Sequence, residues 1–141
     1  MKKLLGFIFI IFLIVFIVGC GKNETTDYLE GDWKTDFDDG NGNNYIIFKE
    51  NESLKQFSDK NKGKYSNDEY KYTVEPTDEV NTFIVKYSSS GVYAELKFKK
   101  LDENTMRRTH VKISSIISTQ EIDTDNIYHR INRKHWWNPF D

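Results

Sequence analysis

Apolar and polar residues alternate with a period of two through most of the chain, and this alternation limits the possible folds more than any other feature. In residues 92–99 (VYAELKFK), every second side chain is apolar and most of those between them are charged. Residues 69–75, 82–87 and 126–131 show the same pattern, and clusters rich in Ser, Asp, Asn and Gly separate these segments. The sequence therefore predicts an all-β domain, an antiparallel meander that closes into a small β-barrel.

The alternation also predicts which face of a strand is buried. In residues 126–131 (NIYHRI), Ile127, His129 and Ile131 fall on one face, and Tyr128 and Arg130 on the other. We expect the isoleucine face to be the apolar one, which would make His129 a core histidine.

The first nineteen residues form an N-terminal targeting segment. Lys2 and Lys3 precede an apolar run from Leu4 to Val18 that only Gly6 interrupts. A run of this length is short of the roughly 20 residues that span a bilayer. Residues 1–19 are therefore interpreted as a signal peptide.

The residues that follow the apolar run resemble the lipobox of bacterial lipoproteins. Ile17, Val18 and Gly19 precede Cys20, the sole cysteine of the chain. The resemblance implies cleavage after Gly19 and acylation of Cys20, and residues 20–27 then form the lipidated cysteine and a polar tether. The expected location is the extracytoplasmic face of the cell membrane, with the lipid anchor holding the protein to it. The alternative is an uncleaved signal anchor with an incidental cysteine.

Composition excludes several classes of function. Once Cys20 is acylated, no thiol remains for a disulfide, a zinc site or nucleophilic catalysis. Without Lys2 and Lys3, the 20 basic residues fall to 18, against 22 acidic ones. A mildly acidic protein of this kind is not expected to bind nucleic acid.

A second resemblance covers residues 28–132, the predicted barrel domain. Gly31-Asp32-Trp33 resembles the Gly-x-Trp signature that opens lipocalins and their small bacterial relatives, and residues 128–131 (YHRI) resemble their closing strand. The resemblance implies a lipocalin-like barrel in which Trp33 packs across the closed end beneath Arg130. The chain departs from standard lipocalins because it is shorter, cannot form a disulfide and has no predicted helix after the last strand. The alternative is that Trp33 is an ordinary core residue and Arg130 an unrelated surface base.

Residues 39–50 can be interpreted in two ways. Four potential calcium ligands have the spacing of an EF-hand loop: Asp39, Asn41, Asn43 and Glu50. However, Asn44 occupies the position where glycine is usual, and the β-branched and aromatic residues 45–48 (YIIF) suit a strand. The sequence favours a hairpin turn and predicts no metal or other cofactor. A second possibility is that three acidic residues, Asp36, Asp38 and Asp39, attract a cation weakly.

Few residues suggest catalysis. His110, His129 and His135 do not have the spacing of a metal site, and no nucleophile motif surrounds Ser114 or Ser115. We therefore expect that the protein is not an enzyme.

The C-terminal tail, residues 133–141 (RKHWWNPFD), combines basic and aromatic residues. Trp136, Trp137 and Phe140 suit contact with a membrane interface or with a partner protein. Alternatively, these aromatic residues fold back over one end of the barrel.

These features together predict a lipid-anchored, non-enzymatic binding module. Its ligand would be a small apolar molecule in the barrel or a surface molecule at its rim. The alternative is a protein–protein interaction lipoprotein of the inhibitor, immunity or exclusion type, whose barrel is filled by side chains.

Overall fold

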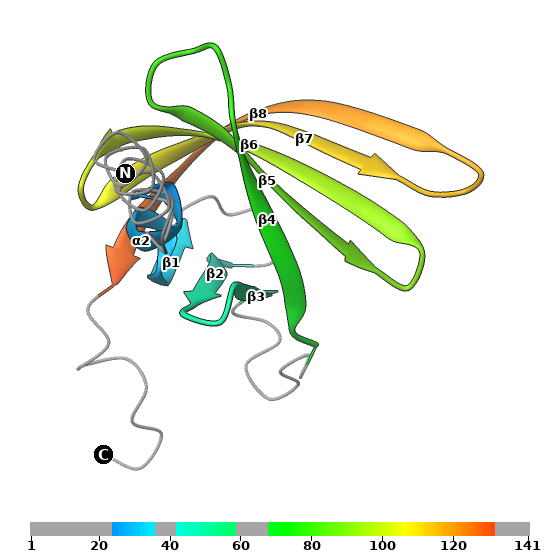
Figure 1. Cartoon of the computed structure of the whole chain (residues 1–141), viewed down its shortest axis with the longest axis horizontal. Helices are drawn as coiled ribbons and strands as arrows, with labels where there is room; N and C mark the ends of the chain where they lie inside the picture. Colours follow the sequence, from blue (N-terminus) through cyan, green and yellow to red (C-terminus); the bar gives the residue numbers. More distant parts are fainter. Residues whose placement is uncertain (1–23, 36–41, 59–67, 132–141) are drawn as a thin grey trace, which may run out of the picture.

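A computed structural model describes residues 24–35, 42–58 and 68–131, which form one helix and eight strands (Figure 1). Strands dominate because most of these segments carry the two-residue alternation that gives a strand one apolar face. The elements are α2 (Glu24–Leu29), β1 (Gly31–Thr35), β2 (Asn44–Lys49), β3 (Ser53–Ser58), β4 (Tyr70–Pro76), β5 (Thr82–Ser89), β6 (Val92–Asp102), β7 (Thr105–Ser114) and β8 (Thr119–Ile131).

The eight strands form a closed antiparallel barrel in which each strand pairs with its neighbours in sequence. The ring closes where β1 pairs with β8, with Trp33 opposite Arg130. The predicted all-β class, the antiparallel meander and the closure into a barrel are therefore confirmed. Two bulges interrupt the pairing of β6 with β7, and another separates Arg108 from His110 in the pairing of β7 with β8.

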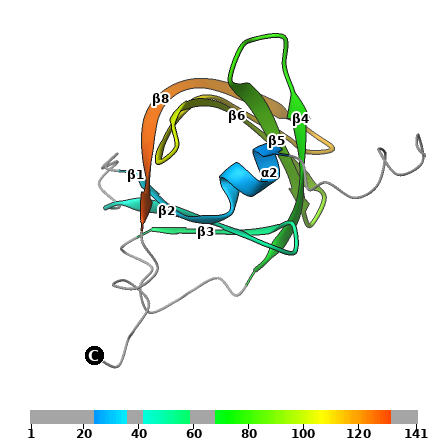
Figure 2. The same cartoon turned by 60° about the vertical axis from the view of Figure 1, so that its left-hand side comes forward.

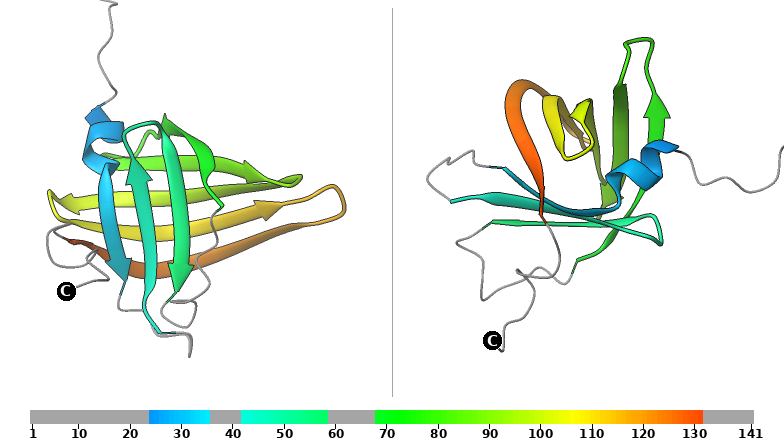
Figure 3. Two further views of the ribbon diagram at one scale, coloured as in Figure 1. Left: turned by 90° about the horizontal axis from the view of Figure 1, so that it is seen from below. Right: turned by 90° about the vertical axis from the view of Figure 1, so that its left-hand side faces the viewer.

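The barrel has two distinct ends. Helix α2 lies within the ring of strands at the capped end, together with turns 50–52, 77–81 and 103–104 (Figure 2). Turns 90–91 and 115–118 lie at the far end, where the long strands β5–β8 extend beyond β1–β3 (Figure 3). Strand β8 ends at Ile131, which pairs with Asp32, so residues 24 and 131 both lie at the capped end.

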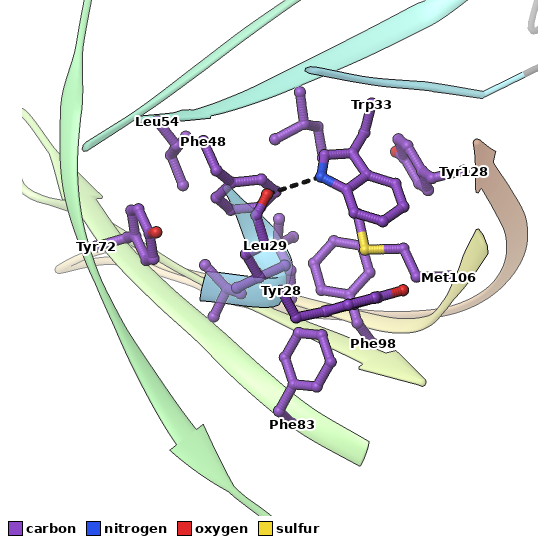
Figure 4. Close-up of a cluster of buried hydrophobic side chains, with 13 residues drawn as sticks. Tyr28, Leu29, Trp33, Phe48, Leu54, Tyr72, Phe83, Phe98, Met106 and Tyr128 are labelled. Atoms are coloured by element: carbon purple, nitrogen blue, oxygen red, sulfur yellow. Dashed lines mark hydrogen bonds between the residues drawn. The ribbon is translucent and has the colours of Figure 1, made fainter. Parts of the chain in front are cut away.

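Large apolar side chains fill the interior near the capped end (Figure 4). Trp33, Phe48, Leu54, Phe98 and Met106 have no solvent exposure. The rings pack closely: those of Phe83 and Phe98 lie 5.9 Å apart, as do those of Phe98 and Tyr128. This part of the barrel is a packed core, and burial of its side chains supplies the main driving force for folding.

Helix α2 was not predicted. Residues 21–27 were expected to be a polar tether without regular structure, but Glu24–Leu29 is helical. Tyr28 and Leu29 at its C-terminal end are buried in the core. A helix of six residues is unstable in isolation, so these tertiary contacts explain why it forms.

The seam between β3 and β4 is the shortest in the barrel. These strands pair at two positions, Ser53 with Lys71 and Leu54 with Tyr70. A side-chain network supports this short seam: Glu69 accepts hydrogen bonds from Lys49, Asn51 and Ser53. These hydrogen bonds lower the pKa of Glu69 to about 2.

Strands β1 and β2 form the hairpin that the sequence favoured. They pair in antiparallel register from Gly31 opposite Phe48 to Thr35 opposite Asn44. An EF-hand would require helices at these positions. Asp36, Asp38, Asp39 and Asn41 lie outside the described residues.

Within the described ranges, no helix is long and apolar enough to cross a membrane.

Candidate functional site

Trp33 lies on β1 at the centre of the capped end. Its side chain has no solvent exposure, and its Nε1 donates a hydrogen bond of 2.8 Å to the carbonyl oxygen of Leu29 (Figure 4). A buried indole N–H needs such an acceptor. Trp33 therefore anchors α2 to the barrel wall.

Arg130 on β8 lies over the same indole. Its guanidinium carbon is 4.3 Å from the centroid of the Trp33 ring. The two terminal nitrogens donate to the carbonyl oxygens of Glu30 and Tyr28, each at 2.5 Å. These contacts join the last strand of the barrel to the helix that precedes the first.

Gly31 makes the close approach of Arg130 possible. A Cβ atom at this position would lie 3.0 Å from Nη1 of Arg130, and the φ angle of +127° strains any other L-residue. The structure thus brings together the three residues of the sequence signature: Gly31, Trp33 and Arg130.

Tyr28 completes the capped end. Its hydroxyl donates to the carbonyl oxygens of Asp102 at 3.1 Å and Thr105 at 3.0 Å. Burial raises the pKa of this phenol. Because the ring and hydroxyl of Tyr28 and the guanidinium of Arg130 are all engaged by the protein itself, the capped end is organised to hold α2 in place.

An open pocket of about 420 Å³ lies between α2 and the turn at residues 77–81. Its lining is largely polar and includes Glu24, Asp78, Glu79 and Lys100. Glu79 forms an ion pair of 2.5 Å with Lys97. In the described part of the chain, no three His, Cys, Asp or Glu residues gather into a group that could hold a metal.

The far end exposes several large apolar residues. Ile116 and Ile117 at the β7–β8 turn are 97% and 92% exposed, and Ile122 on β8 is 55% exposed. The turn is closed by a hydrogen bond of 2.8 Å from the Ser115 amide to the Ser118 carbonyl. Ile113, opposite Gln120 near the tip, is also exposed.

Polar side chains meet inside the barrel beyond the core. Gln56 donates a hydrogen bond of 2.8 Å to the hydroxyl of Tyr87, which connects β3 to β5. Arg108 on β7 lies opposite Asn126 on β8, and its guanidinium carbon is 5.5 Å from the centroid of the Tyr128 ring. Burial raises the pKa values of Tyr87 and Tyr128, and the positive charge of Arg108 opposes both shifts. This interior polar cluster was not identified from the sequence.

The predicted buried face of β8 was wrong. Tyr128 is 1% exposed and packs in the core, whereas His129 is exposed. The pairing of Tyr128 with Met106 on β7 decides the orientation, because Met106 belongs to the core. Alternation alone was ambiguous here, since both faces of residues 126–131 carry large apolar groups.

The described histidines lie apart. His110 contacts Asp123 on the neighbouring strand, with Nδ1 and Oδ1 2.8 Å apart, and His129 faces solvent. His135 lies outside the described residues, as do the predicted lipidation site, Gly19 and Cys20, and the aromatic residues of the tail, Trp136, Trp137 and Phe140.

Solved structures share the fold of this chain at low sequence identity, and pallilysin is an example. The crystal structure of Treponema pallidum Tp0751 (pallilysin) aligns with a TM-score of 0.53 and 10% identity, over 75% of this chain and 82% of that chain. No protein-family model matches the sequence, and no curated protein sequence matches it. The comparisons therefore show a shared barrel fold.

Proposed function

We propose that this protein is a lipid-anchored, extracytoplasmic and non-enzymatic binding module of the lipocalin-like lipoprotein type. Its far end would bind a small apolar ligand or the apolar part of a surface molecule. The observation that carries the proposal is the contrast between the two ends of the barrel: the capped end engages its own polar groups, whereas the far end exposes isoleucines. Exposed apolar patches on small proteins often mark binding surfaces.

The positions of the chain ends suit an orientation in which the capped end faces the membrane and the far end is free to bind a ligand. Helix α2 begins four residues after Cys20, and β8 ends at Ile131 beside β1. An acyl group on Cys20 would therefore hold the capped end near the membrane, and residues 133–141 would leave the barrel at the same end. Their basic and aromatic side chains suit the headgroup region. The far end would then face away from the lipid.

The far end also provides an apolar surface on the inner face of the extended strands. Val111 lies opposite Leu96 of the core and opposite Ile122, so all three side chains belong to the inner face. Ile113 lies opposite Ala94, which is buried. An apolar ligand at this surface would cover Ile113 and Ile122, which the barrel leaves partly exposed.

Binding of an environment-sensitive apolar dye tests this proposal. We expect the dye to fluoresce in the presence of the protein and Ile113→Ser with Ile122→Ser to reduce that signal strongly. Val80→Ser is the matched control, because Val80 is 81% exposed but lies at the capped end. An equal loss of signal in both variants would contradict binding at the far end. Native mass spectrometry would then identify any ligand that co-purifies.

A second candidate function is contact with a partner protein through the turn at residues 115–118. Ile116 and Ile117 at this turn are almost fully exposed. Site-specific photo-crosslinking in cells would separate the two candidates. If a crosslinker at position 116 gives a discrete adduct with another protein and one at position 80 gives none, the result favours the second candidate, contact with a partner protein.

A further inference from the structure

We propose that Arg108 and Asn126 form a carboxylate-binding site inside the barrel, and that the ligand is a small monocarboxylate with an apolar chain. This inference rests on the proposed function and specifies the polar group of its ligand. It follows from the placement, the partners and the surroundings of these two side chains.

Both side chains point into the barrel. Arg108 is two residues after Met106 on β7, and Asn126 is two residues before Tyr128 on β8. Met106 and Tyr128 pair with each other and belong to the core. Because alternate residues of a strand share a face, Arg108 and Asn126 lie on the inner face and directly opposite each other.

Each side chain has a buried donor that finds no acceptor among the described residues. Asn126 is 5% exposed, and its Nδ2 makes no hydrogen bond to the described residues. The Nε of Arg108 is likewise buried and without a hydrogen-bond partner. Buried donors in native proteins nearly always have an acceptor, and leaving them without one is costly. An acceptor bound at these directly opposed residues would satisfy both donors.

The charge of Arg108 specifies what kind of acceptor this is. Among the described residues, Arg108 has no ion-pair partner, whereas the adjacent Arg107 has one. Arg107 points outward and its Nε lies 3.2 Å from Oδ1 of Asp125. Arg108 has an aromatic contact with Tyr128 and lies on the partly buried inner face. A carboxylate would neutralise its charge and accept hydrogen bonds from the guanidinium in a bidentate arrangement, while the amide of Asn126 adds a donor.

The surroundings indicate an apolar chain behind the carboxylate. Beyond the bulge at residues 108–110, the inner face continues with Val111, Ile113 and Ile122 toward the far end. On the other side the packed core begins with Tyr128 and Phe98. A ligand can therefore extend toward the far end, where its chain would cover the isoleucines that are now partly exposed.

Titration with hexanoate tests the proposal, because its chain is short enough to keep it water-soluble. The full-length protein, purified from membranes and placed in nanodiscs, is titrated with hexanoate carrying a ¹³C label in the carboxyl group. We expect a saturable change in the carboxyl resonance. Arg108→Gln should weaken binding by about 10- to 100-fold, as for loss of a charged hydrogen-bonding partner. Arg107→Gln is the matched control and should bind like the wild type.

Asn126→Asp provides an independent test that does not require removal of the arginine. The new carboxylate would occupy the site from within the chain, so we expect hexanoate binding to be lost and the thermal midpoint to rise. Hexanol separates this inference from the proposed function, because it has the chain without the carboxylate. If hexanol and hexanoate bind equally well and Arg108→Gln changes neither, the carboxylate site is refuted while apolar binding stands. If neither compound binds, both proposals fail.

Discussion

Trp33 and Arg130 lie opposite each other across the seam between β1 and β8, with the guanidinium carbon 4.3 Å from the centroid of the indole. This side-chain contact reinforces the antiparallel pairing of the first strand of the barrel with the last. Arg130 also donates to two carbonyl groups at and just after the end of α2, so it connects three elements.

Truncation of these two residues should reveal that they act together. We expect Trp33→Ala to lower the free energy of unfolding by about 3–5 kcal/mol, as for other buried large aromatic residues. Arg130→Ala should cost less, about 1–3 kcal/mol, through the loss of charged hydrogen bonds. Urea unfolding of the single and double variants should give losses that are not additive. Tyr93→Ala, which removes an aromatic ring that is 63% exposed, is the control. Additive losses would show that the stacking contributes no stability.

The role of α2 can be tested at its last residue. Leu29 has no solvent exposure, so Leu29→Ala should lower the free energy of unfolding by about 2–5 kcal/mol. Asp27→Ala in the same helix faces solvent and should change it by less than about 0.5 kcal/mol. If both substitutions had similar small effects, α2 would be a tether that contributes nothing to the fold.

Alkaline pH should destabilise the protein through Tyr72. Burial raises the pKa of Tyr72 from its usual value of 10.0 to about 12. As the pH rises from 10 to 12, the hydroxyl of Tyr72 therefore loses its proton in the unfolded chain but largely keeps it in the native state. Stability is therefore full below pH 10 and falls by about 2–3 kcal/mol as the pH rises toward 12.

Tyr72→Phe isolates that contribution. The hydroxyl of Tyr72 is buried and has no hydrogen-bond partner in the described part of the chain, so its removal should leave stability at pH 7 unchanged or slightly higher. Urea midpoints measured from pH 8 to pH 11 should decline less steeply in the variant. An identical decline would assign the alkaline loss to other groups.

Calcium should have little effect on stability, because β1 and β2 form a hairpin where an EF-hand would need helices. A site whose dissociation constant is near the ion concentration would add about 0.4 kcal/mol, whereas a micromolar site in millimolar calcium would add about 4 kcal/mol. Thermal unfolding in chelator and in calcium distinguishes these cases. A large upward shift that disappears in Glu50→Gln would instead establish calcium binding at this loop.

Lipidation can be tested by metabolic labelling with an alkyne fatty acid. We expect the label in the wild-type protein and none in Cys20→Ser, which should also keep its signal peptide. Equal labelling of the two proteins would exclude Cys20 as the site of acylation.

The alternation of apolar and polar residues predicted the strands well because each strand has one face toward the interior of the barrel. The alternation at residues 92–99 corresponds to β6, and residues 69–75 and 82–87 correspond to β4 and β5. Helix α2 escaped prediction since its polar first residues carry no periodic signal, and Tyr28 and Leu29 order it through distant contacts.

The interior polar cluster could not be predicted for a different reason. Whether Arg108 meets Asn126 depends on the register between β7 and β8, and a bulge between Arg108 and His110 shifts that register. A shift of one residue would turn a side chain to the opposite face of the sheet. In the sequence, Arg107 and Arg108 are equivalent neighbours, and only the pairing of the strands turns one outward and the other inward.

Closure of the ring between β1 and β8 determines the order in which the barrel is completed during folding. The hydrogen bonds from Arg130 to Glu30 and Tyr28 join positions that are 100 and 102 residues apart. The hairpins between consecutive strands need only local contacts and can form as the chain emerges, whereas contacts at such separations form late and slow folding. A growing chain therefore keeps β1 without its second partner until residue 130 has been made and can fold. During this interval the open edge of β1 can pair with another chain, so rapid completion of the barrel, or a chaperone, protects the chain against aggregation.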